Sequence, residues 1–255
     1  MTLTISIITV CRNSETTIRD TINSVLSQDY SEIEYIIVDG GSTDATLDII
    51  REYGDEISLV ISERDDGIYD GMNKGIRASS GDLIGFLNSD DFYASSSVLK
   101  IVVQAFKNLS LMACYADLCY VDAQDTSKIV RYWKSSQFVP GVFLDGWCPP
   151  HPTFFVRREV YQKYGNFDLG FRIAADVELM IRFLEHFSIP VVYIPKIFVL
   201  MRMGGETNKN LKNIFWQNIE IWNALKQHDL SPSFFRFALG KLLSRSKQFV
   251  SRPRI

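Results

Sequence analysis

Two adjacent carboxylates end an apolar stretch in the segment GFLNSDDFY, residues 85–93. Asp90 and Asp91 repel each other there, so an opposite charge in front of them would offset that cost. Mg²⁺ and Mn²⁺ take oxygen ligands, often one or two carboxylates together with substrate phosphates. Asp90 is therefore predicted to bind a divalent metal. Asp91 fits either the metal site or the N-cap of a helix predicted over 96–107.

Polar residues also follow the other apolar stretches of the first ninety residues. They are Thr9 to Asn13 after the first stretch, Asp39 after the second, and Glu63 to Asp66 after the third. Ligands of open α/β sheets bind beyond the carboxyl ends of the strands. These polar groups are therefore expected to share one site with Asp90.

The elements that would position these residues alternate between strand and helix. Apolar runs predict strands over 4–10, 35–38, 57–62 and 82–87, with helices between them that include 44–53 and 68–79. This order predicts a Rossmann-like, mostly parallel central sheet flanked by helices. The second half is less regular, with short strands over 111–147, a helix over 174–187, and two strands separated by Pro195.

Charge is unevenly distributed along the 255 residues, which are 46% apolar and carry a net charge of −3. Residues 211–255 contain eight Lys/Arg and two Asp/Glu, whereas residues 1–210 contain 19 basic and 28 acidic residues. This balance excludes a globally basic nucleic-acid binder. The four cysteines have no metal-binding spacing, and no apolar run reaches the roughly 18 residues of a membrane span. A cytoplasmic protein is expected, either free or peripheral at the inner face of the cell membrane.

Several motifs in order resemble family 2 glycosyltransferases, which are inverting nucleotide-sugar enzymes of GT-A fold. They are TVCRNSETTIRDTINSVLSQDY, IIVDGGSTDAT, DDGIYDGMNKGIRASSGDLIGFLNSDD, HPTFFVRREVY with GNFD, and AADVELMIR. The resemblance covers about the first 205 residues. It implies a GT-A catalytic domain over 1–205, with a nucleotide-binding half (1–92) and an acceptor-binding half (93–205). Residues 206–255 would form a helical, basic C-terminal extension.

The resemblance also implies which residues contact the nucleotide. They are Thr9, Cys11, Arg12, Asp39, Asp66, Lys74 and Asn88. A carboxylate such as Asp39 can accept a hydrogen bond from a uracil N3–H or a ribose hydroxyl. Lys74 would either add positive charge near the pyrophosphate or remain a solvated helix residue. Asn88 replaces the first aspartate of the family's D-x-D motif, which puts metal affinity in doubt.

The second half would supply the catalytic base and the acceptor pocket. Asp176 is the predicted base, with Glu178 as the alternative, and its competing role is to cap the helix that follows. Arg202 is predicted to reach the pyrophosphate from a glycine loop at 204–205 that could act as a lid. Trp147 and His151 are predicted to border the acceptor, although Trp147 also fits a core position. For His151, a structural role and metal ligation are the alternatives.

The expected reaction is inverting transfer of a hexosyl or N-acetylhexosaminyl group from a nucleotide sugar, preferably a UDP-sugar, with Mg²⁺ or Mn²⁺. The acceptor would be a saccharide or lipid-linked saccharide of cell-surface polysaccharide synthesis. Asn88 suggests one alternative function, a catalytically weak scaffold that binds a nucleotide sugar. A nucleotidyltransferase is a second alternative, but the segment TVCRNSETT matches the phosphate loop of such enzymes poorly. The apolar and basic segment 232–255 would either contact the membrane or pack on the catalytic body.

Overall fold

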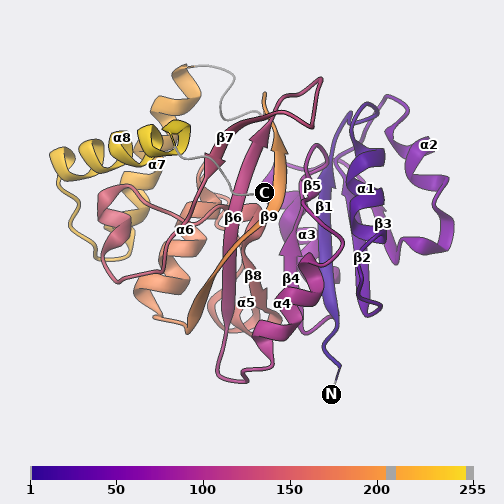
Figure 1. Cartoon of the computed structure of the whole chain (residues 1–255), viewed down its shortest axis with the longest axis horizontal. Coiled ribbons are helices and arrows are strands. Elements are labelled where there is room, and N and C mark those ends of the chain that lie inside the picture. The colour runs from indigo at the N-terminus through magenta and orange to yellow at the C-terminus, as the bar shows by residue number, and fades with distance from the viewer. Residues whose placement is uncertain (1, 205–210, 251–255) are drawn as a thin grey trace.

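The computed structural model describes residues 2–204 and 211–250, which fold around one nine-stranded sheet (Figure 1). The strand order is β3-β2-β1-β4-β8-β6-β9-β5, and β7 pairs with β6. The strands are β1 (Ile5–Cys11), β2 (Ile33–Asp39), β3 (Leu59–Ser62), β4 (Leu83–Phe86), β5 (Phe92–Tyr93), β6 (Ala113–Val121), β7 (Ile129–Trp133), β8 (Phe155–Arg157) and β9 (Val191–Arg202).

The N-terminal half of the sheet is parallel, as the alternating pattern predicted. β1 lies between β2 and β4, and β2 pairs with β3, all in parallel. All seven residues of β1 are buried, because helices cover both faces of the sheet at this position. Cys11 lies opposite Asp39 in the register, so the first two strands end at the same level. The carboxyl ends that carry the polar residues therefore meet at one edge.

The C-terminal half of the sheet is mixed. β8 runs antiparallel to β4 and β6, whereas β9 runs parallel to β6 and antiparallel to β5. The two strands expected on either side of Pro195 form one strand, β9. Ala116 pairs with Ile194 and Asp117 with Ile197, so Pro195 and Lys196 bulge out of the ladder. A bulge accommodates proline because proline has no N–H to donate.

The helices form a layer on each face of the sheet, over two apolar clusters. One cluster includes Ile5 and Ile7 with apolar residues of α1 and α4, and the other includes Ile8 with residues of α3, α5 and α6. Alternate residues of β1 thus face opposite layers. The helices are α1 (Ile18–Leu26), α2 (Thr46–Arg51), α3 (Ile68–Ala78), α4 (Val98–Phe106), α5 (Arg158–Tyr164), α6 (Ala175–Ile181), α7 (Leu211–Gln227) and α8 (Phe234–Val250). Shorter helical turns are η1 (Gly54–Glu56), η2 (Val142–Asp145), η3 (His151–Thr153) and the π-helical η4 (Arg182–His186).

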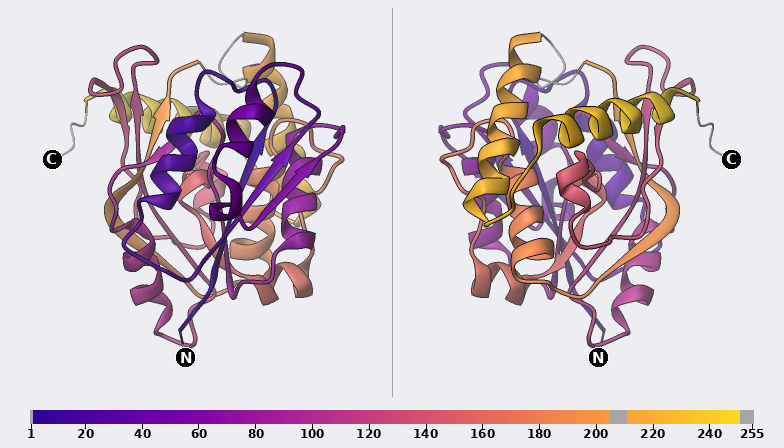
Figure 2. Two further views of the ribbon diagram at one scale, coloured as in Figure 1. Left: turned by 90° about the vertical axis from the view of Figure 1, so that its right-hand side faces the viewer. Right: turned by 90° about the vertical axis from the view of Figure 1, so that its left-hand side faces the viewer.

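The last two described helices pack on the rest of the fold at the side of α6 (Figure 2). α7 buries Ile221, Ala224 and Leu225 in the same apolar cluster as α6, and α8 contributes Phe237. Of the two alternatives for segment 232–255, packing on the body holds for the inner face of α8. Within residues 2–204 and 211–250, no helix is both long and apolar enough to cross a membrane.

Candidate active site

A cavity of about 890 Å³ lies at the carboxyl ends of β1 and β4. Its walls come from both halves of the chain, because the β1–α1 loop and the β4–β5 segment face residues near α6 and η3. Eight of the twelve predicted site residues line it: Cys11, Arg12, Asn88, Asp90, Trp147, His151, Asp176 and Arg202. Residues separated by more than 160 positions in the sequence thus share one space.

Hydrogen bonds between neighbouring loops hold the β1 side of the cavity. The side-chain oxygen of Asn13 accepts the Thr43 N–H at 2.9 Å, and the Asn13 N–H donates to the Ser42 hydroxyl at 2.8 Å. The hydroxyls of Ser14 and Ser89 lie 2.9 Å apart, which joins this loop to the NSDD segment. Asn13 has a φ of 51°, a conformation that asparagine tolerates better than most residues. Arg12 is therefore presented from a backbone fixed on two sides.

Two predicted nucleotide residues are buried behind the wall of the cavity. Asp39 is fully buried and accepts the Ser62 hydroxyl at 2.8 Å and the Ser42 N–H at 3.1 Å. The hydroxyl of Thr9 lies 3.1 Å from the phenolic oxygen of Tyr35. Asp39 therefore holds the GGS turn and the end of β3 together. Its contact with a nucleotide remains a prediction, and neither residue lines the cavity as described.

The loop before α3 presents Asp65 to the cavity, whereas the predicted residue Asp66 does not line it. A Cβ added to Gly40 would overlap the Asp65 carboxylate, so the missing side chain at 40 makes room for this aspartate. Lys74 also lies outside the cavity walls. Its ammonium contacts Glu63 at 2.9 Å and Asp70 at 3.4 Å. In this conformation Lys74 braces the loop that carries Asp65.

The NSDD segment forms the acidic floor of the cavity. Asp91 is fully buried; one of its oxygens accepts the Asn88 amide at 3.0 Å, and the other has no hydrogen-bond partner among the described residues. Burial, and after it the charge of Asp90, raises the pKa of Asp91 well above its ordinary value. The helix alternative for Asp91 is not realised, since α4 begins after Ser97 and makes no side-chain cap.

These carboxylates fit a divalent cation shared with a substrate. No group of three or more His, Cys, Asp or Glu side chains that could hold a metal occurs in the described part of the chain. Half-buried Asp90, beside the orphaned oxygen of Asp91, instead suits Mg²⁺ or Mn²⁺ that also binds phosphate oxygens and water. The amide of Asn88 donates its hydrogen bond to Asp91, and this neutral side chain adds no charge to the site.

Arg202 closes the acidic floor from β9. Its guanidinium donates to the backbone carbonyl of Asp90 at 2.8 Å, pairs with Asp20, and lies over the Phe92 ring at 5.0 Å. The arginine therefore positions the Asp90 backbone, and its predicted contact with a pyrophosphate stays a prediction. Gly204 also lines the cavity, whereas the rest of the proposed lid, from Gly205 onward, lies outside the described residues.

Asp176 lies in the first turn of α6 and faces the cavity. Its carboxylate accepts the Tyr69 hydroxyl at 2.9 Å, a contact between the two halves of the chain. Burial, and after it the charge of Asp176, raises the pKa of Tyr69 well above its ordinary value. Asp176 does not cap α6. The carboxylate of Glu220 on α7 instead accepts the backbone N–H groups of residues 172–174 at 2.8 to 3.1 Å.

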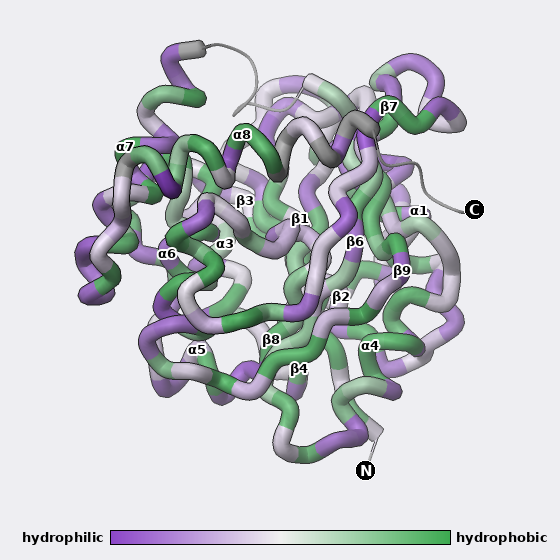
Figure 3. Tube along the Cα trace, turned by 60° about the vertical axis from the view of Figure 1, so that its left-hand side comes forward, coloured by the Kyte–Doolittle hydropathy of each residue, from purple (hydrophilic) through white to green (hydrophobic). Residues whose placement is uncertain are grey.

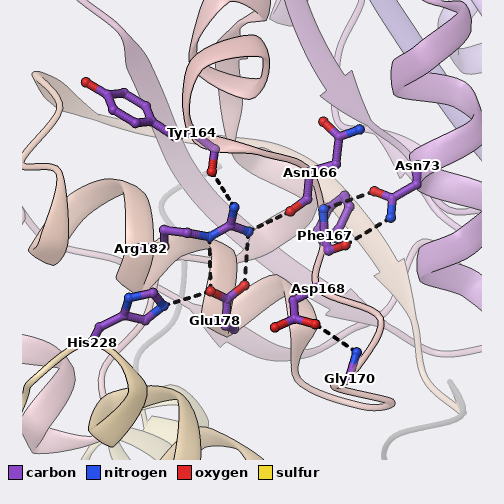
Figure 4. Close-up of polar contacts among 9 residues, drawn as sticks. All are labelled: Asn73, Tyr164, Asn166, Phe167, Asp168, Gly170, Glu178, Arg182 and His228. Atoms are coloured by element: carbon purple, nitrogen blue, oxygen red, sulfur yellow. Dashed lines mark hydrogen bonds and ion pairs between the residues drawn. The ribbon is translucent and has the colours of Figure 1, made fainter.

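Glu178, the alternative base, lies in a buried ionic cluster with Arg182 and His228 (Figure 4). Its carboxylate binds the Arg182 guanidinium through two contacts of 3.0 Å and the His228 ring at 2.7 Å. Arg182 also donates to the backbone carbonyls of Tyr164 and Asn166. Glu178 therefore has a structural role, because its contacts join α6, α7 and the loop after α5. It does not line the cavity.

His151 and Trp147 also form part of the cavity wall. The His151 ring stacks on Phe86 at 5.4 Å between centroids, and its Nε2 is buried with no hydrogen-bond partner among the described residues. Burial lowers the pKa of His151, while the charge of Asp176 opposes this change. Trp147 packs edge-on against Phe143 and Tyr115 and still lines the cavity. It is thus a core residue with one exposed face.

Sequence reasoning missed several residues of the cavity wall. Asp65 was included only as part of the polar run Glu63 to Asp66, and the nucleotide contact was predicted for its neighbour Asp66. Tyr69 carried no signal except its place on the face of the predicted helix 68–79. Arg131 and Gln248, which hydrogen-bond to each other at 2.7 Å, lie in segments with no motif. Only the packing of α8 beside β7 brings those two together.

A mostly parallel α/β sheet with an acidic carboxyl edge, facing a second half that adds a carboxylate on a helix, defines a GT-A-type architecture. The sequence matches the family described as glycosyl transferase family 2 over residues 6–165. The chain therefore belongs to glycosyltransferase family 2. An uncharacterized glycosyltransferase of Mycobacterium tuberculosis is 34% identical over 181 residues, which is 70% of this chain and 68% of the relative.

Further relatives extend the similarity. A PGL/p-HBAD biosynthesis glycosyltransferase of Mycobacterium bovis is 26% identical over 205 residues, covering 78% of this chain and 77% of that protein. The structure of S. aureus TarS 1–349 in complex with UDP-GlcNAc superposes with a TM-score of 0.68 at 18% identity, covering 90% and 68%. The mannosyltransferase PcManGT from Pyrobaculum calidifontis, in complex with GDP-Man and Mn²⁺, gives a TM-score of 0.62 at 15% identity, covering 97% and 80%. These structures share the fold.

Proposed function

We propose that this glycosyltransferase transfers a hexosyl or N-acetylhexosaminyl group from a UDP-sugar to a saccharide, with inversion at the anomeric carbon. The observation that carries the proposal is that Asp90 and Asp176, from opposite halves of the chain, line one cavity. One carboxylate suits the cation of a sugar diphosphate, and the other suits a base. A scaffold that binds the nucleotide sugar without turnover would need only the carboxylate that suits the cation.

The nucleotide would lie against the β1 side of the cavity. Cys11, Arg12 and Asp65 line that side, and the Asp65 carboxylate can accept the N3–H of a uracil. We assign to Asp65 the contact expected at Asp66, because Asp65 faces the space that the nucleotide must enter. The structural neighbour TarS is described in complex with UDP-GlcNAc, which is consistent with a uridine donor.

The acceptor hydroxyl would enter between Asp176 and His151. Its oxygen attacks the anomeric carbon while Asp176 takes its proton, and the bond from that carbon to the diphosphate oxygen breaks on the opposite face. The Tyr69 hydroxyl, which donates to Asp176, orients the carboxylate toward the incoming proton. Mg²⁺ or Mn²⁺ held at Asp90 would stabilise charge on the departing diphosphate.

The acceptor class follows from relatives and from the cavity wall. Aromatic side chains with one free face, such as Trp147, suit the apolar faces of sugar rings. A relative is named for PGL/p-HBAD biosynthesis. We propose a saccharide or lipid-linked saccharide of cell-surface synthesis as the acceptor, with the protein acting in the cytoplasm.

Calorimetric titration of UDP and of GDP, each with and without Mn²⁺, tests the donor side. We expect UDP binding that requires Mn²⁺ in the wild type and is lost in Asp90→Asn, because the asparagine cannot balance the cation's charge. The exposed Asp55→Asn serves as the matched control and should bind normally. Metal-independent binding would remove Asp90 from the site, and binding of GDP alone would replace the uridine donor. Hydrolysis of a bound UDP-sugar would exclude the inactive scaffold.

A further inference from the structure

Helix α8 presents an apolar stripe to solvent although its other face is packed. Phe235, Leu239, Leu242 and Leu243 are 83%, 59%, 65% and 52% exposed. Their spacing of i, i+4, i+7 and i+8 places them on one side of an α-helix. The inner face carries Phe237, which is 5% exposed. The stripe therefore contributes nothing to the folded core, and no described residue covers it.

The outward position of α8 can be followed in two views. It lies across the outside of the body in the right panel of Figure 2, and strongly hydrophobic positions recur along it in Figure 3. The helix is also firmly attached. Arg236 binds the Asp145 carboxylate through contacts of 2.5 and 2.9 Å, and Gly240 lies so close to the Asp145 backbone that a Cβ would overlap it. The stripe is thus held in a fixed direction.

The sequence around this stripe has an unusual charge. From Phe234 to Val250, the bounds of α8, it contains four Lys/Arg and no Asp/Glu, and one of the four, Arg236, is paired with Asp145. Residues 1–233 contain 21 basic and 30 acidic residues, a net of −9. An apolar stripe within a purely basic segment is the composition of helices that lie in the interface of a bilayer containing anionic lipids.

We propose that the outer face of α8 docks on an anionic lipid bilayer. Two-fold pairing with a second copy of the chain would bring two purely basic segments together, because the same patch meets itself across such an axis. Like charges would oppose that contact, whereas anionic head groups neutralise them. Charge complementarity therefore selects the bilayer over a dimer.

The docked helix would also orient the active site. The inner residues Phe237, Lys241 and Gln248 line the cavity beside Trp147, on the side proposed for the acceptor. A bilayer on the outer face of α8 would lie one helix away from that side. This step rests on the proposed function and deepens it: it selects a lipid-linked saccharide, presented at the membrane surface, as the acceptor.

Sedimentation with vesicles tests the docking directly. Wild-type protein is mixed with vesicles of phosphatidylglycerol and phosphatidylcholine, or of phosphatidylcholine alone, at low and high salt. We expect binding to the anionic vesicles that weakens with salt and falls by about tenfold or more in the triple variant Phe235→Ser, Leu239→Ser, Leu242→Ser. The control variant Leu59→Ser, Leu109→Ser, Leu169→Ser removes three exposed apolar side chains elsewhere and should bind like the wild type.

Three results would overturn the proposal. They are no binding of the wild type to anionic vesicles, equal binding by the triple variant, and light scattering that shows a dimer which only the triple variant loses. UDP titration without vesicles tests the proposed function independently of membrane docking. The triple variant should bind UDP normally, which also shows that it folds. A wild type that binds vesicles but no nucleotide would contradict the enzyme assignment and leave the docking standing.

Discussion

Single side chains decide the chemistry of this site, and Asp176 is the clearest case. Its carboxylate faces the cavity from the first turn of α6, accepts a hydrogen bond from Tyr69, and does not cap the helix. A residue with no structural task at its helix end, but with an orienting partner, fits a role in proton transfer.

Replacing Asp176 with asparagine keeps the shape of the side chain and removes its basicity. We expect the rate of sugar transfer to fall by about 10²- to 10⁴-fold, the usual contribution of a general base. UDP binding should stay unchanged, because the position proposed for the nucleotide is on the β1 side of the cavity, away from Asp176. Tyr69→Phe should give a smaller loss, since it only frees the orientation of the carboxylate. Transfer by Asp176→Asn at the wild-type rate would refute the assignment.

At the scale of elements, two sets of polar contacts hold the second half of the fold in place, and one of them reaches the first half. Asn73 on α3 exchanges two hydrogen bonds, of 2.9 and 3.0 Å, with the backbone of Phe167. The cluster of Glu178, Arg182 and His228 ties α6 to α7 and to the loop after α5 (Figure 4). These contacts fix the helix that carries Asp176.

Breaking the Glu178 cluster should destabilise the protein strongly. Arg182→Met leaves a buried carboxylate without its main partner, for which we expect a loss of about 3–5 kcal/mol in the free energy of unfolding. Arg51→Met is the matched control, because the Arg51–Asp48 pair is largely exposed and should cost less than about 0.5 kcal/mol. Urea denaturation measures both. A loss of unfolding free energy for Arg182→Met as small as that for Arg51→Met would show that the cluster adds no stability.

At the scale of the whole molecule, stability should depend on pH through the buried ring of His151. Burial lowers its pKa from the ordinary value of 6.5, so the folded protein keeps this histidine neutral. Below that pH the unfolded chain binds a proton that the folded chain does not. The free energy of unfolding must therefore fall as the pH drops below 6.5.

Urea denaturation between about pH 7.5 and 5.5 tests this dependence. The wild type should lose stability toward the acidic end, and His151→Gln, which cannot take up a proton in either state, should lose less. Both proteins share all other titrating groups, so the difference in slope reports on His151. Parallel slopes would mean that His151 takes up its proton equally well in the folded protein.

The sequence by itself determined the parallel first half of the sheet and the strand ends, because β-branched runs make buried strands and turn residues mark where they stop. Its motifs, through their resemblance to known enzymes, indicated the family. Asn88 and Asp90 could be placed at the cavity because they directly follow a strand in a parallel sheet. The same rule placed Cys11 and Arg12.

Only the tertiary structure decided which side chains face the cavity and which make contacts that stabilise the fold. Asp65 and Asp66 are neighbours with the same chemistry, and the direction of one turn separates them. Asp176 and Glu178 lie on one short helix, and the packing of α7 takes one of them into an ionic cluster. The local sequence pattern cannot predict which of two neighbouring carboxylates faces the cavity, because side-chain direction is set by contacts between segments far apart in the sequence. The stripe on α8 became visible for the same reason, once its inner face had been covered.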